Sequence, residues 1–519
     1  MSADATTTET LAGFVERHAR QRPDDVAIRY AELRWSWADW ASRIRRAAGA
    51  LRAAGVQRGQ CVAFLDKNHP ACLETLFGAA SIGVVTTVVN WRLSGEELIH
   101  VLQDSGARVL FVGAELVSAA AAAAARVPAL ERIVVLGGDH DQYESLLAAA
   151  SPVETDADVA DSEIALVIYS SGTTGRPKGV LLSQRALVNH AANLAPAFPF
   201  ADGDSNLVAM PLFHVGGIGY ALFGIRAGVP TIITREPDPA VLIAAVRAGA
   251  THAFFVPPVI ARFLDADETA SAAISGLRYI VYGAAPMPLP LLQRALSTWT
   301  DTNFVQVYGQ TEVCGGVTAL SNADHRDAAR PGLQLSAGKA VLGTEIRIVD
   351  PETGDRLPTG EPGEIWVRSN QNMTGYLNRP EATADTITAG DWVRTGDVGR
   401  LDSDDYVYIE DRLKDMIITG AENVYGPEVE SVLIEHPAIA DAAIIGVPDE
   451  HWGESVKAIV VVTTEVEPGD VIEFCRRHLA GYKCPRTVDF VASIPRNASG
   501  KILKTSLREP YWQNRARKV

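Results

Sequence analysis

Residues 164–183 read IALVIYSSGTTGRPKGVLLS, and this stretch decides which fold the chain adopts. Its first part, Ile164–Tyr169, is apolar and rich in β-branched side chains, which predicts a buried strand. A loop of glycines, hydroxyls and two cations follows, and Ser183 then stands where a helix N-cap is expected. A strand, a glycine-rich loop and a helix predict one unit of an α/β fold.

The loop from Ser170 to Gly179 has the composition of an anion-binding site. Glycines let backbone N–H groups turn inward as a nest, hydroxyls add hydrogen-bond donors, and Lys178 adds a positive charge. The spacing differs from the GxxxxGK(S/T) pattern of a Walker A loop. A solvent-exposed turn is the alternative, but so many donors in one loop favour a phosphate site. The expected phosphate ligands are Ser170, Ser171, Gly172, Thr173, Thr174, Gly175 and Lys178.

Outward from this loop, short β-rich runs alternate with helical patterns through roughly the first 300 residues. Four of these runs are Arg108–Val112, Arg132–Leu136, Pro230–Thr234 and Tyr279–Tyr282. Each run is followed by glycine or polar turn residues and then by a helical pattern. This alternation indicates parallel α/β layers.

The pattern changes near residue 340. From Glu345 to Tyr408 the strands are separated by turns, which predicts an antiparallel β subdomain over about residues 340–411. After Asp411 the chain reads as an α+β domain of about a hundred residues, enough to fold as a small unit. We therefore expect a large N-terminal domain over residues 1–411 and a C-terminal lid over residues 412–519.

Composition and charge narrow the function classes. A chain of 519 residues predicts two or three domains, and its apolar content of 47% is typical of a globular protein. The net charge of −16, without a basic stripe, argues against nucleic acid as a partner. The cysteines form no CxxC pair, which favours reduced thiols and a cytoplasmic location. They are Cys61, Cys72, Cys314, Cys475 and Cys484.

Membrane insertion is not expected from the sequence. No apolar run reaches the roughly 18 residues that a transmembrane helix needs. The N-terminus lacks the basic and apolar regions of a signal peptide. Peripheral membrane contact and a homodimer both stay open.

Five further motifs follow the loop in order: YGAAPM at 282–287, VYGQTE at 307–312, WVRTGD at 392–397, DRLKD at 411–415 and PRNASGK at 495–501. Together with YSSGTTGRPKGV, they resemble the signatures of the adenylate-forming superfamily of acyl-CoA synthetases, firefly-type luciferases and peptide-synthetase adenylation domains. The resemblance covers nearly the whole chain. It implies a large N-terminal domain of layered α/β subdomains plus a β subdomain, followed by a small mobile α+β lid.

The resemblance implies that several of these residues bind ATP and AMP. Gly283, Ala284 and Ala285 would lie against adenine, because small residues let a flat ring approach the backbone. Tyr308, next to Gly309, would offer a ring on which the base stacks.

Other motif residues would hold the phosphates and the ribose. Thr311 would contact the α-phosphate, and Glu312 would offer a hard carboxylate to Mg²⁺. Asp397 would accept hydrogen bonds from both ribose hydroxyls, since an ionised carboxylate only accepts. Arg412 resembles a further ribose or phosphate contact.

Two lysines would serve the mobile lid. Lys501 matches the catalytic lysine of the family, and Lys414 stands at the hinge position. Attack of a carboxylate on the α-phosphate brings anions together, so a cation delivered by domain closure would stabilise the transition state.

The acyl pocket is expected to be apolar and uncharged. His214 resembles the residue that borders the carboxylate in the family, and the neighbouring glycines would leave room for the acyl group. The expected lining residues are His214, Val215, Gly216, Gly217, Gly309, Gly315 and Gly316.

Coenzyme A would bind on the lid. The stretch TGAEN at 419–423 matches the strand that lines the pantetheine tunnel, with Ala421 where many relatives have glycine. Cys484 replaces a frequent basic residue nearby. The expected contacts are Gly420, Ala421, Glu422, Tyr482, Lys483 and Arg486.

The resemblance thus implies an ATP- and Mg²⁺-dependent acyl-CoA synthetase that forms acyl-AMP and transfers the acyl group to coenzyme A. The residues of its motifs most resemble those of bacterial fatty-acyl-CoA ligases. A medium- to long-chain or alicyclic acid is therefore the first expectation, and an aryl acid is the second. A carrier-protein-loading enzyme is disfavoured because His214 stands where peptide synthetases place an aspartate. A non-catalytic nucleotide-binding protein and a luciferase-like oxygenase are the remaining alternatives.

Overall fold

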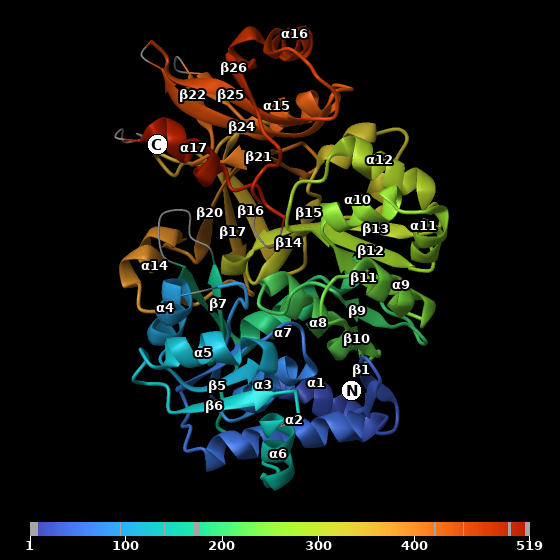
Figure 1. The fold of residues 1–519 in the computed structure, drawn as a ribbon, viewed down its shortest axis with the longest axis vertical. Helices are drawn as coiled ribbons and strands as arrows, with labels where there is room; N and C mark the ends of the chain where they lie inside the picture. Colours follow the sequence, from blue (N-terminus) through green and yellow to red (C-terminus); the bar gives the residue numbers. More distant parts are fainter. Residues whose placement is uncertain are drawn as a thin grey trace, which may run out of the picture.

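The computed structural model describes residues 9–93, 95–139, 141–170, 177–419, 422–449, 451–496 and 500–513. In these ranges, two α/β sheets with their helices lie side by side in the larger part of the molecule, an antiparallel sheet lies between them and the C-terminal domain, and the C-terminal domain forms one end (Figure 1). A large N-terminal domain with α/β sheets is followed by a small α+β C-terminal domain. The fold class expected from the sequence is therefore confirmed.

One α/β sheet carries the loop that is expected to bind phosphate. Five of its strands run parallel, and two antiparallel strands close the edge next to the loop. The parallel strands are buried on both faces because helices cover them, as with α3 (Pro70–Ser81), whose residues are all buried. In spatial order, its described strands are β18 (Gly375–Tyr376), β8 (Lys178–Ser183), β7 (Ile164–Ser170), β4 (Val85–Val88), β3 (Cys61–Leu65), β5 (Ala107–Gly113) and β6 (Arg132–Leu136).

A second α/β sheet carries the motifs expected to bind adenine and the acyl group. It is parallel from β1 through β13 in space and antiparallel at both ends. In spatial order, its described strands are β15 (Lys339–Ala340), β14 (Gly315–Leu320), β13 (Asn303–Gln310), β12 (Tyr279–Gly283), β11 (His252–Phe255), β9 (Asn206–Val208), β10 (Thr231–Ile233), β1 (Val26–Tyr30) and β2 (Leu33–Ser36).

Helices α7 (Gln184–Asn193) and α8 (Val215–Ala227) pack between these two sheets. Leu187 of α7 and Ile218 of α8 belong to one buried core together with strand residues of both sheets, such as Ile168 and Val208. The sequence of α8 explains this position, because its apolar residues and glycines are buried around nearly the whole helix. Outer helices complete the layers: α1 (Leu11–Gln21), α2 (Trp37–Ala53), α4 (Gly95–Ser105), α5 (Val117–Ala124), α6 (Gln142–Ala149), α9 (Pro239–Arg247), α10 (Pro257–Asp265), α11 (Glu268–Ile274) and α12 (Leu289–Thr298).

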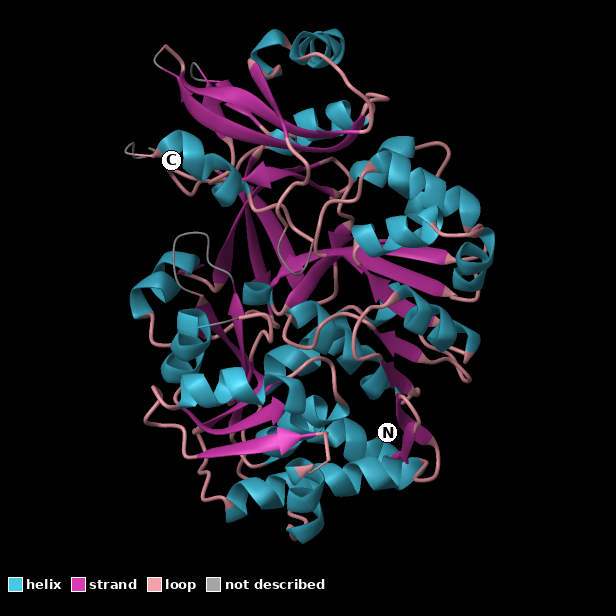
Figure 2. Ribbon diagram, viewed as in Figure 1, coloured by secondary structure: helices cyan, strands magenta, loops and turns pink. Residues whose placement is uncertain are grey.

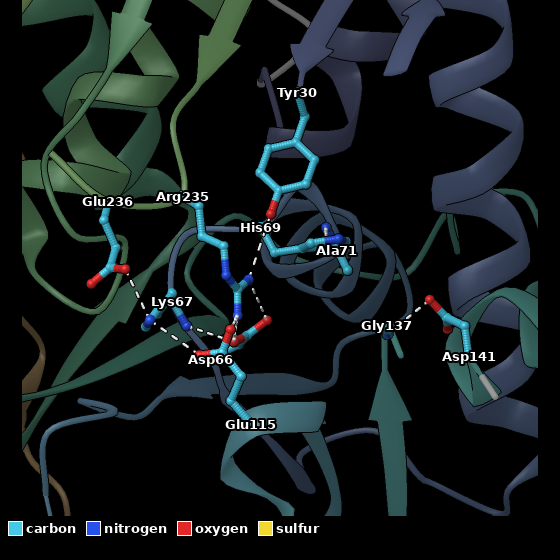
Figure 3. A network of polar contacts seen from close by, with 10 residues as sticks. All are labelled: Tyr30, Asp66, Lys67, His69, Ala71, Glu115, Gly137, Asp141, Arg235 and Glu236. Carbon is cyan, nitrogen blue, oxygen red and sulfur yellow. Dashed lines mark hydrogen bonds and ion pairs between the residues drawn. The ribbon is translucent and has the colours of Figure 1, made fainter. Parts of the chain in front are cut away.

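A polar junction joins the ends of the two α/β sheets (Figure 3). Asp66 follows β3 and Arg235 follows β10, and the Asp66 Oδ1 atom lies 3.0 Å from Arg235 Nη2. Burial raises the pKa of Asp66, while Arg235 opposes this shift. Lys67 pairs with Glu236 at 2.9 Å and with Glu115 at 3.1 Å. These contacts fix the relative position of the two sheets.

An antiparallel β subdomain follows, as the sequence predicts. It consists almost entirely of strands, whereas helices flank both α/β sheets (Figure 2). Its described strands are β16 (Thr344–Val349), β17 (Gly363–Ser369), β19 (Ile387–Thr388), β20 (Trp392–Leu401) and β21 (Val407–Arg412), and α14 (Pro380–Thr386) lies beside them.

The C-terminal domain has its own sheet and core. The domain boundary expected after residue 411 stays a prediction; β21 ends at Arg412, and β22 begins at Ile417. The described elements are β22 (Ile417–Thr419), β23 (Glu422–Val424), α15 (Gly426–Ile434), β24 (Ile439–Asp449), β25 (Gly453–Val462), α16 (Pro468–His478), β26 (Thr487–Phe490) and α17 (Lys504–Trp512). Within the described ranges, no helix is both long and apolar enough to span a membrane.

Candidate active site

The two ends of the expected phosphate loop lie side by side. Ser170 ends β7 and pairs in register with Lys178, which begins β8. Ser183 then caps α7, because its Oγ atom accepts a hydrogen bond of 3.1 Å from the N–H of Ala186. The central loop residues Ser171, Gly172, Thr173, Thr174 and Gly175 lie outside the described residues.

Glu312 lies next to this loop. It belongs to a short 3₁₀ turn, Thr311–Val313, directly after β13. Its Oε1 atom accepts hydrogen bonds from the Ser170 hydroxyl at 3.3 Å and from the Tyr376 hydroxyl at 3.0 Å. Lys178 Nζ lies 4.9 Å from the centre of the Tyr376 ring. Tyr376 thus joins the expected carboxylate to the expected phosphate lysine, and no motif in the sequence had indicated it.

The chemistry of Glu312 fits a magnesium ion that accompanies a nucleotide. Among the described residues, no cluster of three or more histidine, cysteine or acidic side chains could hold a metal alone. Mg²⁺ usually takes one or two carboxylates from the protein and fills its shell with phosphate oxygens and water. A single carboxylate beside a phosphate loop matches this requirement.

Asp397 lies in a polar cluster with two other predicted residues. Its Oδ2 atom accepts a hydrogen bond of 2.8 Å from the Tyr308 hydroxyl, and its Oδ1 atom lies 3.5 Å from Arg412 Nε. The pairing of β20 with β21 places Asp397 opposite Arg412 in register. Burial and the charge of Asp397 raise the pKa of Tyr308 well above its usual value, so the phenol stays a donor.

The expected adenine segment lies beside Tyr308. Gly283 ends β12 and pairs in register with Val307. A side chain at Gly283 would collide with the Val307 carbonyl, so only glycine fits there. Ala284 has a φ of +64°, a left-handed conformation that is uncommon for a residue with a side chain. The turn formed by Gly283, Ala284 and Ala285 therefore begins at the end of β12. The neighbouring strand, β13, carries Tyr308.

Lys501 of the C-terminal domain interacts electrostatically with residues of the N-terminal domain. Burial and the charge of Arg412 lower its pKa to about 8, while Asp397 and Glu312 oppose this shift. Burial and the charges of Arg92 and Lys501 lower the pKa of His214 to about 4. His214 is therefore neutral near pH 7, and its Nε2 atom has no hydrogen-bond partner among the described residues.

The loop that carries Lys501 is anchored to the lid sheet. Arg496 pairs with both carboxylate oxygens of Asp441 on β24, at 2.8 and 2.9 Å. The same guanidinium donates a hydrogen bond of 3.0 Å to the carbonyl oxygen of Gly500. Residues 497–499 lie outside the described ranges.

The expected hinge is held by α17. Arg508 pairs with Asp415 at 2.7 Å, next to Lys414. Burial and Arg412 lower the pKa of Lys414 to about 8. Asp411, on the other side of the hinge, accepts a hydrogen bond of 2.8 Å from the N–H of Gly426, and burial raises its pKa to about 6.

A cavity of about 30 Å³ lies between α7, α8 and the second α/β sheet. Four residues expected in the acyl pocket line it: Val215, Gly216, Gly315 and Gly316. His214, Gly217 and Gly309 lie outside the lining, and a side chain at Gly217 would press on the backbone of Pro211. Reasoning from motifs missed the other lining residues, His190, Leu194, Phe198, Tyr220, Phe223, Phe254, Val281 and Val307.

The expected coenzyme A residues lie apart from this centre, on the lid. Gly420 and Ala421 fall outside the described residues, and Glu422 begins β23 with an exposed side chain. Lys483 pairs with Glu428 at 2.7 Å, and Cys484 is buried in the lid core.

An exposed aromatic surface lies near these residues. The guanidinium of Arg486 lies 5.2 Å from the centre of the Trp452 ring. Trp452 is 46% exposed and Tyr482 is 42% exposed, which is unusual for such large apolar rings. The sequence did not indicate Trp452, because a single tryptophan in a turn gives no periodic pattern.

Comparison with known proteins extends these findings. Residues 15–377 match the family model of the AMP-binding enzyme, and residues 428–501 match the AMP-binding enzyme C-terminal domain. A feruloyl-CoA synthase of Amycolatopsis sp is 38% identical, with 96% of this chain and 99% of that protein covered. A long-chain-fatty-acid–CoA ligase of Mycobacterium tuberculosis is 36% identical, with 98% and 97% covered.

Solved structures are similar over the same length. The o-succinylbenzoate CoA synthetase of Bacillus subtilis, in complex with its acyl-adenylate intermediate, has a TM-score of 0.84 at 29% identity, with 95% of this chain and 97% of that chain covered. The same enzyme in complex with ATP and magnesium ion has a TM-score of 0.82 at 28% identity, with 95% and 98% covered.

Proposed function

We propose that this chain, which belongs to the AMP-binding enzyme family and is an AMP-forming acid–thiol ligase, activates an aryl carboxylic acid and transfers the aryl-acyl group to coenzyme A. ATP and coenzyme A are its co-substrates, and Mg²⁺ accompanies ATP. The observation that carries the site assignment is the position of Lys501. A lid lysine shares one electrostatic environment with His214, Glu312 and Asp397 of the N-terminal domain and with Arg412 at the domain boundary.

In the first half-reaction, a carboxylate oxygen of the acid attacks the α-phosphorus of ATP. A new O–P bond forms, and the bond to the bridging oxygen breaks, so that pyrophosphate leaves with the electron pair. Lys501 and Thr311 would stabilise the charge that accumulates on the phosphate in the transition state. The neutral His214 would border the carboxylate without adding a charge that competes with Lys501.

The other polar residues would hold the nucleotide. Asp397, positioned by Tyr308 and Arg412, would accept the ribose hydroxyls with its remaining lone pairs. The hydroxyl of Ser170 and the ammonium of Lys178 would contact the phosphates. Glu312 would hold Mg²⁺, which neutralises phosphate charge when it is bound.

In the second half-reaction, the thiol of coenzyme A attacks the acyl carbon. A C–S bond forms, the C–O bond to phosphate breaks, AMP leaves, and the thiol proton passes to solvent. Rotation of the lid about Lys414 would withdraw Lys501 and bring the lid strand β23 to the site. Trp452, Tyr482 and Arg486 would bind the adenine of coenzyme A, because exposed rings and a guanidinium stack on a base.

The cavity supports an aryl acid as the substrate. Its lining includes the rings of Phe198, Tyr220 and Phe254, against which an aromatic ring can pack edge to face or offset. The space of about 30 Å³ is smaller than such a ring, so the walls would have to move apart when the acid binds. A relative at 38% identity is named for feruloyl transfer to coenzyme A. The fatty or alicyclic acid favoured by the sequence remains the competing prediction, with the relative from Mycobacterium tuberculosis on its side.

The thiol state of the cysteines fits the cytoplasmic location proposed from the sequence. All five cysteines are free and buried in the folded chain. Burial raises the pKa of Cys72 and Cys314, so both thiols stay protonated and unreactive.

A thioester-formation panel tests the proposal. The purified enzyme is given ATP, Mg²⁺, coenzyme A and single acids: benzoates, phenylacetates, cinnamates and straight-chain acids of six to sixteen carbons. We expect the highest kcat/KM with an aryl acid, with one AMP formed per thioester. Activity confined to straight-chain acids would overturn the aryl assignment, and release of ADP instead of AMP would overturn the reaction.

A further inference from the structure

A buried carboxylate lies beside the strand that carries Asp397. Glu364 is on β17 and is only 2% exposed. β17 pairs antiparallel with β20, and Glu364 is opposite Val398, the residue that follows Asp397. Glu364 lies in none of the sequence motifs that indicated the site. Its position in the sheet nevertheless places its side chain next to the turn that precedes Asp397.

Both carboxylate oxygens of Glu364 accept hydrogen bonds. Oε2 accepts from Arg394 Nε at 3.1 Å and from Trp366 Nε1 at 2.9 Å. Arg394 Nη2 lies 3.0 Å from the same oxygen, so an ion pair anchors this side of the carboxylate. Oε1 accepts a hydrogen bond of 3.2 Å from the backbone N–H of Gly396. One oxygen is therefore held by side chains, and the other holds the backbone of the turn.

The turn before Asp397 needs such contacts to keep one conformation. Gly396 has a φ of +68°, and a glycine backbone is free to move unless its neighbours fix it. The carbonyl oxygen of Gly396 accepts a hydrogen bond of 2.9 Å from the N–H of Leu413, next to the expected hinge. The Thr395 hydroxyl accepts one of 3.1 Å from the N–H of Asp397. Glu364 completes this set, because it pairs the N–H of Gly396.

An ionised carboxylate suits this position because all of its neighbours are donors. Gly396, Arg394 and Trp366 each present an N–H to Glu364. A glutamine would turn its NH₂ group toward one of them, and two donors cannot pair. If its carbonyl oxygen faced Arg394 and Trp366, its NH₂ group would face the N–H of Gly396. The hydrogen bond to the turn would then be lost.

We propose that Glu364 is a positioning residue for ATP recognition: its carboxylate holds the turn at Gly396 so that Asp397 faces both ribose hydroxyls. This inference rests on the proposed function, in which Asp397 binds the ribose. A buried ion pair is by itself a weak source of stability, so the pair with Arg394 does not account for a charge at this position. The hydrogen bond to the turn does, and Glu364 acts on the nucleotide only through Asp397.

The test compares ATP with 2′,3′-dideoxy-ATP, which lacks both ribose hydroxyls, on wild-type enzyme and on Glu364→Gln. Pyrophosphate release with an acid that the wild type accepts gives kcat/KM for each nucleotide. The wild type should prefer ATP at least about a hundredfold, because the analogue loses two hydrogen bonds to a charged group.

In Glu364→Gln, the preference for ATP should shrink. We expect kcat/KM for ATP to fall about tenfold and kcat/KM for the analogue to change less than about threefold. The loss should lie mostly in KM for ATP, because the ribose is bound alike in the ground state and the transition state. A variant that is partly unfolded would lose activity with both nucleotides equally, so the ratio of the two values reports on the ribose contact alone.

Trp366→Phe is the matched control. It removes one donor to Oε2 of Glu364 but keeps Arg394 on that oxygen and Gly396 on Oε1. The preference for ATP should therefore stay at the wild-type value.

Glu364→Asp provides the measurement if Glu364→Gln does not fold. Aspartate keeps the charge for Arg394 but withdraws the carboxylate by one C–C bond, about 1.5 Å, so it cannot hold both Arg394 and Gly396. The preference for ATP should again fall below the wild-type value.

The outcomes separate the inference from the function on which it rests. If the Glu364 variants slow both nucleotides by the same factor, Glu364 only stabilises the β subdomain, and the inference is wrong. The inference also fails if Trp366→Phe lowers the preference as much as Glu364→Gln does. If the wild type uses both nucleotides equally well, Asp397 does not bind the ribose, and that part of the proposed function fails with it.

Discussion

Arg496 donates a hydrogen bond of 3.0 Å to the carbonyl oxygen of Gly500, the residue immediately before Lys501. The same side chain pairs with both carboxylate oxygens of Asp441 on β24. Gly500 itself has a φ of +83°, which only glycine adopts without strain. The loop of the expected catalytic lysine is therefore fixed to the lid sheet by one guanidinium.

Replacing this guanidinium should impair adenylation more than thioester formation. Arg496→Ala removes the support of the loop but leaves Lys501 in place, so we expect about a tenfold loss in acid-dependent ATP–pyrophosphate exchange. Thioester formation from supplied acyl-adenylate should change less than threefold, since the proposed lid rotation would withdraw Lys501 from the site before that step. Arg496→Lys should recover only part of the loss, because lysine lacks the planar fork. An equal loss in both half-reactions would mean that Arg496 only stabilises the lid.

The rate of adenylation should depend on the charge of Lys501. A lysine is charged below its pKa, and burial with Arg412 lowers the pKa of Lys501 to about 8. The kcat/KM of adenylation should therefore fall as the pH rises through about 8. His214, with a pKa of about 4, should add no step between about pH 5 and pH 8.

Lys501→Arg is the control for this pH profile. Arginine stays charged throughout the range, so the decline near pH 8 should disappear even though the absolute rate is lower. A decline of the same shape in Lys501→Arg would assign the titration to another group.

Glu312 should determine the Mg²⁺ concentration that the enzyme needs for half-maximal activity. In Glu312→Gln the charged oxygen is lost, and we expect the Mg²⁺ concentration for half-maximal activity to rise about tenfold or more. Tyr376→Phe removes a hydrogen bond to the same oxygen but keeps the carboxylate, and should shift the Mg²⁺ requirement by less than about threefold. Mg²⁺ titrations of both variants provide the measurement. An unchanged requirement in Glu312→Gln would place the ion elsewhere.

The ion pair between Arg508 and Asp415 should stabilise the lid. Both side chains are nearly buried, so Arg508→Ala leaves an unpaired carboxylate and should cost about 3 kcal/mol in the free energy of unfolding of the lid. Burial alone would raise the pKa of Asp415, but Arg508, Lys504 and Lys414 hold it below 3.8. The stabilisation is thus present above about pH 4 and lost as the pH falls further.

Urea unfolding at pH 7, followed by tryptophan fluorescence, measures this contribution. The double variant Arg508→Ala with Asp415→Asn should be less destabilised than the sum of its single variants. Strict additivity would show that the pair contributes nothing.

The sequence predicted the elements that have local signals. The strand β7, the cap at Ser183 and the antiparallel β subdomain follow from periodicity, N-cap chemistry and turn spacing. The cluster of Asp397 with Arg412 also follows from sequence, because both lie in motifs of the family.

The remaining site residues depend on contacts between distant segments. Tyr376 reaches Glu312 across 64 positions, and Arg496 reaches Asp441 across 55. Tyr220 is an unremarkable apolar position of α8 until the helix is seen against Phe198 and Phe254. Neither composition nor spacing determines which face of α8 lines a cavity. For this reason the acyl group was the weakest part of the sequence-based prediction.

The most direct test of the account is the effect of Lys501→Ala on the two half-reactions, measured with an aryl acid that the wild type accepts. We predict that acid-dependent ATP–pyrophosphate exchange falls at least about a hundredfold. Thioester formation from the corresponding aryl-adenylate and coenzyme A should stay within about threefold of wild type, since that step involves no attack on the α-phosphate for Lys501 to stabilise. Loss of both half-reactions by the same factor would contradict the account.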